Sequence, residues 1–134
     1  MTALTADRNT QMKDPTLFAF KVAAAAKIYA GALVVANASG YAAGGSTAAT
    51  LTYLGRADES VDNTSGSNGD QLIRVRRGQA FKWANHGADA VTQAEIGKTC
   101  YIVDDQTVAK TSNSSARSAA GIVLAVDADG VWVL

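Results

Sequence analysis

The apolar residues of this chain fall in short runs separated by turn-forming residues, and this pattern constrains the fold more than any other feature. Within residues 71–84 the chain alternates with a period of two. One parity is apolar: Ile73, Val75, Phe81 and Trp83. The other parity places Arg74, Arg76 and Lys82 together. A period of two predicts β-strands with one face inward and the other outward.

Two hairpins are predicted further along the chain. In the last segment, an Asp-Gly turn at 127–130 separates Ile122–Val126 from Val131–Leu134, and this is a strong hairpin signal. Thr99–Val103 and Thr107–Thr111 flank a second turn. Residues 17–36 favour two or three short strands, although the alanine run at 23–26 alone favours helix.

One short helical turn is predicted at 92–97, where Thr is followed three residues later by Glu and then by a closing Gly. Many short strands with a single helical turn are typical of a barrel or a sandwich. We therefore expect an all-β fold, mostly strand, in the form of a compact small β-barrel or sandwich.

The chain divides into two parts. Residues 1–16 are polar, lack a period and end in Asp14-Pro15, which predicts an extended N-terminal arm. A disordered terminus is one interpretation of this arm, and a segment that orders only against a neighbour is the other. Residues 17–134 are expected to form a single β-rich domain, a usual size for one domain.

Net charge, cysteine content and apolar run length limit which kinds of partner and covalent link the chain can have. Twelve basic and twelve acidic residues cancel, whereas nucleic-acid binders usually show a basic surplus, so no nucleic-acid partner is expected. One cysteine cannot form an intrachain disulfide. The first residues do not resemble a signal peptide, and no apolar run approaches the roughly 20 residues of a membrane span. We expect a chain made in a cytoplasm, with no membrane partner.

Candidate catalytic and metal-binding residues are few. His86 is the only histidine, and Cys100 lies in an apolar strand. A hydrolase using either is the competing hypothesis, but no nucleophile-elbow, phosphate-loop or zinc-ligand spacing is present. Asp127-Ala128-Asp129-Gly130 lacks the later ligands of a calcium loop. We expect no enzymatic activity, no cofactor and no metal.

Two surface features are candidate contact sites. Arg74, Arg76 and Lys82 form either a solvated strand face that protects a sheet edge or a docking face for an acidic protein surface, with nucleic acid as a third alternative. The last strand is apolar on both faces, with Trp132 and Leu134 on one side and Val131 and Val133 on the other. We expect the protein core to cover one side and a subunit contact to cover the other.

Several blocks of sequence carry a family resemblance. The most specific block is 97–111, GKTCYIVDDQTVAKT. Further blocks are 55–57 with 60–64, 75–78, 117–123 and the closing Asp-x-x-Gly-Val-Trp-Val at 127–133. Together these blocks resemble capsid decoration (head cement) proteins of tailed phages and prophages. The segment 30–34, AGALV, is similar to cement proteins in general.

The resemblance implies a β-barrel subunit, a homotrimer, made in the bacterial host cytoplasm and placed on the exterior of a virion capsid. There it would bind the major capsid protein and stabilise the head by bridging major capsid subunits. A tail, baseplate or fibre component of a phage particle is the alternative. The resemblance implies no catalytic residues.

Overall fold

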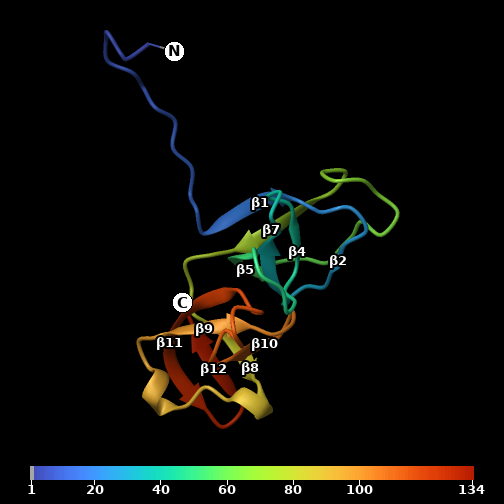
Figure 1. Ribbon diagram of the computed structural model, residues 1–134. Helices are drawn as coiled ribbons and strands as arrows, with labels where there is room; N and C mark the ends of the chain where they lie inside the picture. Colours follow the sequence, from blue (N-terminus) through green and yellow to red (C-terminus); the bar gives the residue numbers. More distant parts are fainter. Residues whose placement is uncertain (1) are drawn as a thin grey trace.

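The computed structural model describes residues 2–134 and is built almost entirely from β-strands (Figure 1). Strand residues make up 40% and helical residues 5%, which confirms the mostly-β prediction. Two 3-10 turns occur, η1 (Gly87–Asp89) and η2 (Gln93–Glu95), where the sequence predicted only the second. In η2 the Glu95 carboxylate accepts the backbone N–H of Thr92 at 2.7 Å, as the capping-box pattern predicts.

The first sheet is formed mainly by the N-terminal half of the chain. Its strands, in spatial order, are β1 (Leu17–Lys21), β7 (Leu72–Arg76), β5 (Thr52–Ala57), β3 (Leu33–Ala36) and β4 (Ala42–Gly44). All neighbours are antiparallel. A single parallel bridge from Val22 to Ala42 brings the first and last strands of this sheet together. A small pair, β2 (Lys27–Ile28) with β6 (Val61–Asp62), lies beside it.

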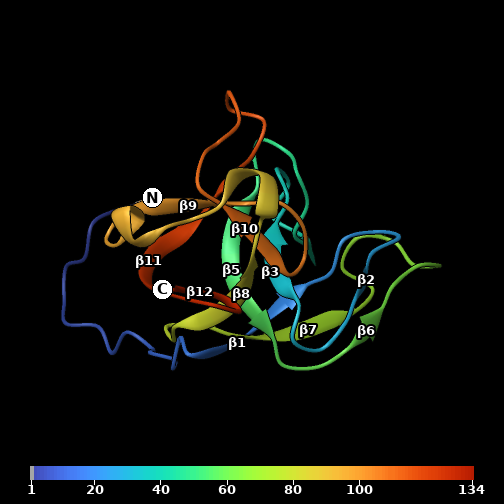
Figure 2. The ribbon, with the colours of Figure 1, turned by 90° about the horizontal axis from the view of Figure 1, so that it is seen from below.

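The C-terminal half forms a closed barrel, which settles the choice between barrel and sandwich (Figures 1 and 2). Around the barrel the strands are β10 (Thr107–Ala109), β8 (Phe81–Asn85), β12 (Gly130–Val133), β11 (Ala119–Asp127) and β9 (Thr99–Ile102). Strands β9–β10 and β11–β12 are the two predicted hairpins. Because the barrel is closed, it leaves no free strand edge.

Side-chain burial follows the period-two pattern. In β7, Ile73 and Val75 are fully buried, and in β8 Trp83 is buried. The two strands nevertheless belong to different sheets, and Gly78, with φ +71°, lies in the connection between them. Alternation alone therefore predicted both strands, but it gave no information on whether the two strands pair with each other.

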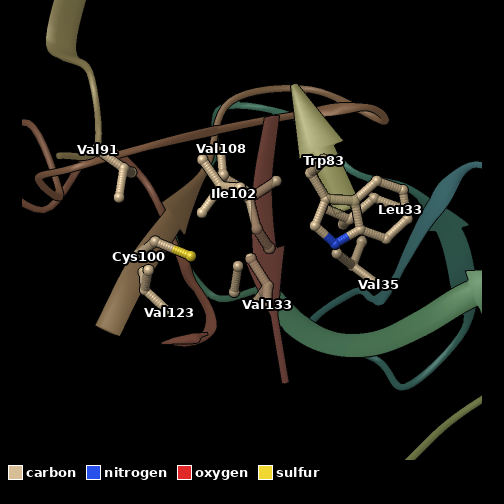
Figure 3. Packing of buried hydrophobic residues seen from close by; sticks show 11 residues of the cluster. Leu33, Val35, Trp83, Val91, Cys100, Ile102, Val108, Val123 and Val133 are labelled. Carbon is tan, nitrogen blue, oxygen red and sulfur yellow. The ribbon is translucent and has the colours of Figure 1, made fainter. Parts of the chain in front are cut away.

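Two apolar clusters form the interior. The barrel cluster, shown in Figure 3, has Cys100, Ile102, Val108, Val123 and Val133 among its members. Leu33 and Val35 of β3 in the first sheet reach into this same cluster. The second cluster is formed by the first sheet and the β2–β6 pair, and its members include Val22, Ile28, Val34, Ile73 and Val75. Side chains from both sheets therefore pack together in the barrel cluster.

The alanine run at 23–26 forms a turn instead of a helix. The backbone N–H of Ala24 donates to the side chain of Asn68 at 2.7 Å, and the Asn63 amide donates to the Ala23 carbonyl at 2.9 Å. Ala25 adopts a left-handed φ of 60°. These contacts come from a loop about forty residues later, so tertiary bonds override the helix propensity of alanine.

The arm predicted for residues 1–16 is extended over the described residues 2–16 and leads away from the two sheets (Figure 1). Near its base, the Asp14 carboxylate accepts the N–H of Thr16 at 2.9 Å. The ammonium of Lys13 lies 4.9 Å from the centre of the Phe18 ring. Within residues 2–134, no helix is long and apolar enough to span a membrane.

Candidate interaction surfaces

The cations Arg74, Arg76 and Lys82 do not lie on one sheet. Arg74 and Arg76 are on β7 in the first sheet, whereas Lys82 is on β8 in the barrel. The prediction of a shared outward face is therefore wrong for Lys82. Each side chain does point away from the apolar clusters, as its parity predicted.

Each of these three cations also has a carboxylate partner. Arg74 Nε lies 3.1 Å from Glu59, and Arg76 lies 3.5 Å from Asp58. Lys82 Nζ contacts both carboxylate oxygens of Asp129 at 3.0 Å. These pairs are partly exposed and so contribute little to stability. Asp58 is shared with Arg56, which also lies 3.5 Å from it, so two arginines face one carboxylate there. The pairing of each cation with a carboxylate agrees with the solvated-face interpretation, while a docking face for an acidic surface stays a prediction.

Glu59 was not among the predicted site residues. Its carboxylate accepts the backbone N–H of Arg74 at 3.0 Å as well as its guanidinium. These bonds, the backbone bond first, lower the pKa of Glu59 below its usual value. The acidic stretch just before β6 contained no spacing signal for this contact, because β5 and β7 become neighbours only in the folded sheet.

The last strand, β12, has one buried and one outer side, as predicted. Val131 and Val133 are fully buried in the barrel and are not available for contacts. Trp132 is half-buried on the outer side and Leu134 is exposed. Of the four residues predicted as subunit contacts, only Trp132 and Leu134 therefore lie on the surface.

Trp132 is held in place by two polar neighbours. Its indole Nε1–H donates to Asp127 at 2.8 Å. The Lys82 ammonium lies 5.6 Å from the ring centre, a cation–π distance, while it also pairs with Asp129. The indole is consequently fixed as a flat apolar element on the outside of the barrel.

The outer side of β11 extends this apolar surface. Ile122 and Leu124 alternate with the buried Val123 and are exposed. Ile122 and Leu134 exchange backbone hydrogen bonds at 3.1 and 2.9 Å, so the two strands place these side chains next to each other. Ile122 and Leu124 were not among the predicted contact residues, although their alternation around Val123 was a usable signal.

A shallow cavity of about 330 Å³ connects this surface to the base of the arm. Its lining includes Pro15, Tyr53, Leu54, Arg77 and Leu134. The arm therefore leaves the body of the protein beside Leu134. Within the arm, Leu4 is 72% exposed and Met12 is 96% exposed.

The two candidate catalytic residues, His86 and Cys100, lie on different elements. His86 is half-buried at the start of η1. Burial raises the pKa of the Cys100 thiol to about 11, and a thiol that stays protonated near pH 7 is a poor nucleophile. Asp127 accepts the indole N–H of Trp132, and Asp129 forms an ion pair with Lys82. Among residues 2–134, no group of three or more His, Cys, Asp or Glu side chains is placed to hold a metal ion.

Asn63 is a buried polar residue in the polar loop at 62–70. It is only 2% exposed, and its amide donates to the carbonyls of Ala23 at 2.9 Å and Ser67 at 3.0 Å. The neighbouring Gly66 leaves no room for a side chain, because a Cβ there would collide with the Asn63 amide. The polar loop at 62–70 is thus an organised element.

Comparison with known proteins adds no relative: no protein-family model, no curated protein and no solved structure matches the chain.

Proposed function

We propose that this protein is a structural virion subunit that decorates the outside of a tailed-phage head and stabilises it by bridging major capsid subunits. The observation that supports this most directly is the arm at residues 2–16. It is extended, it leads away from a body built of two packed sheets, and it exposes two large apolar side chains, Leu4 and Met12. Such a segment can bury its apolar groups by lying against a neighbour.

The body of the protein suits a role on a particle surface. The formal net charge is zero, so identical subunits can crowd together without strong repulsion. A capsid offers many equivalent sites, and bridging two of them multiplies weak contacts through effective concentration. A closed barrel leaves few free strand edges for unwanted pairing.

Binding to separated heads and tails of the phage or prophage that encodes the chain would test this proposal. Tagged protein is mixed with each fraction and pelleted, and bound protein is measured against the major capsid protein. We expect saturable binding to heads and none to tails. Binding to tails alone would favour the baseplate, tail or fibre alternative, and binding to neither would refute a virion role.

The contribution of the arm can be isolated with a matched pair of variants. The double variant Leu4→Ser with Met12→Ser leaves the folded body unchanged, and we expect it to bind heads at least about tenfold more weakly. The control Leu72→Ser removes an exposed leucine from β7, on the body, and should bind like the wild type. Equal binding by all three proteins would show that the arm is not a head contact.

A further inference from the structure

Asn68-Gly69 is the only place in the sequence where an asparagine is followed by a glycine. Asparagine is a thermolabile residue, because water can replace its side-chain amide. The reaction begins when the backbone nitrogen of the next residue attacks the side-chain carbonyl carbon, and glycine hinders this attack least because it has no side chain. The pair lies in the loop at 62–70, at the end of the body away from the arm (Figure 1), and Asn68 is exposed to water.

The backbone of the loop requires glycine at position 69. The N–H of Asp70 donates to the Ser67 carbonyl at 3.2 Å, which closes a turn with the Asn-Gly pair at its centre. Gly69 has φ +83°, in the left-handed region that favours glycine. The reactive pair is therefore a consequence of the turn, and the fold has to accommodate its chemistry.

Both reacting groups are held by one segment, residues 22–24. The side-chain oxygen Oδ1 of Asn68 accepts the backbone N–H of Ala24 at 2.7 Å. The N–H of Gly69 donates to the Val22 carbonyl at 2.9 Å. The first bond fixes the direction of the side-chain carbonyl, and the second keeps the proton on the nitrogen that would have to lose it before attacking. The pair is unreactive for as long as residues 22–24 stay in contact with the loop.

Asn63 fastens this segment to the loop. Its amide donates to the Ala23 carbonyl at 2.9 Å and to the Ser67 carbonyl at 3.0 Å, so it joins residue 23 to the residue that precedes Asn68. Ala24 and Asn68 themselves are exposed. Segments held by a few bonds at the surface can separate without unfolding of the whole protein. One such opening would release both the side chain of Asn68 and the N–H of Gly69.

We propose that Asn68 is a site of spontaneous deamidation whose rate is set by the opening of the contact between residues 22–24 and the loop at 62–70. In the open state, hydroxide removes the N–H proton of Gly69, and the nitrogen attacks Cγ of Asn68. A carbon–nitrogen bond forms, and the side-chain amide takes a proton from water and leaves as ammonia. Water then opens the resulting cyclic imide at one carbonyl to give aspartate, or at the other to give isoaspartate.

The two products affect the loop differently. Aspartate at position 68 retains a side-chain oxygen that can accept the N–H of Ala24. Isoaspartate adds a methylene group to the main chain within the turn, so the bonds to Val22 and Ala24 cannot both form again. Either product adds a negative charge to a chain whose formal net charge is zero. The inference does not depend on the proposed virion role.

The test is peptide mapping by mass spectrometry after incubation of the full chain at mildly alkaline pH, either folded in buffer or unfolded in guanidinium. We expect deamidation at Asn68 to be at least about tenfold slower in the folded protein. Hydrogen exchange at the amides of Ala24 and Gly69 measures the opening independently, and its protection should match this slowing within about tenfold. Equal rates in the two states, a mismatch with exchange, or no reaction at Asn68 in the unfolded chain would overturn the proposal.

A matched pair of variants separates local opening from global unfolding. Asn63→Ala loses the amide bonds that fasten residues 22–24 and should speed deamidation of the folded protein at least about tenfold. Asn85→Ala loses two amide bonds to Val91 in the barrel, both 2.8 Å long, and should leave the rate unchanged. Circular dichroism confirms that each variant is folded. Equal acceleration by both variants would show that the reaction follows unfolding of the whole chain, and acceleration by neither would show that Asn63 does not control it.

Discussion

Replacing Asn63 should destabilise the protein although this residue lies in a polar loop without any apolar side chain. In Asn63→Ala, the amide bonds to the carbonyls of Ala23 and Ser67 are lost. Both carbonyls keep a backbone donor, from Ala26 at 3.3 Å and from Asp70 at 3.2 Å. The penalty is therefore the net worth of two hydrogen bonds, about 1 kcal/mol each, with little added for unpaired groups. We expect a loss of about 2 kcal/mol.

Asn63→Asp should be more destabilising at pH 7 and should depend on pH. A carboxylate of the same shape cannot donate, and its oxygens would face the two carbonyl oxygens. This environment raises the pKa of the new carboxyl in the folded state, so folding takes up a proton. The stability of Asn63→Asp should rise as the pH falls from 7 toward 5, while that of Asn63→Ala should hardly change relative to the wild type.

Equilibrium urea unfolding followed by far-ultraviolet circular dichroism measures both effects. Asn68→Ala is the control. It removes an acceptor of one backbone N–H at a more exposed position and should cost about 1 kcal/mol or less. The reasoning is refuted if Asn63→Ala lies within about 0.5 kcal/mol of the wild type. It is also refuted if the two Asn63 variants are equally stable at every pH.

Three further predictions concern buried positions. Gly55 has φ +144°, and a Cβ there would lie 2.2 Å from the Arg76 carbonyl oxygen. Gly55→Ala should therefore lower the free energy of unfolding, measured by heat or urea, by more than about 3 kcal/mol. The control Gly87→Ala, at a glycine with open space around it, should lower it by less than about 1 kcal/mol. Burial raises the pKa of Cys100 to about 11, from an unfolded value near 8.5. The free energy of unfolding should therefore fall as the pH rises from about 9 through 11. In Cys100→Ala this fall should be shallower, and an unchanged slope would contradict the reasoning. Tyr53→Phe removes the hydroxyl that accepts the Trp83 indole N–H at 3.2 Å. The free energy of unfolding in urea should fall by about 1 kcal/mol, and an unchanged value would show that this bond does not stabilise the fold.

The contribution of local pattern is clearest in the strands. The alternation around Ile73 and Val75 and the Asp-Gly turn at 127–130 predicted β7 and the last hairpin correctly, because side-chain period and turn chemistry act over a few residues. The capping pattern at Thr92 predicted η2 for the same reason. The pattern also predicted which side of the last strand is exposed, because adjacent residues such as Val131 and Trp132 point to opposite faces of a strand.

What a residue meets across space was decided only by the tertiary structure. The pairing of Arg74 with Glu59, the separation of Lys82 from Arg74, and the turn at Ala23–Ala26 depend on which distant segments become neighbours. The same is true of the outer side of β11 and β12, where Ile122 and Leu134 become neighbours through strand register. Local sequence sets how each strand is patterned, but sheet order and register arise from packing the whole chain, so contacts between strands are fixed only when the fold is complete.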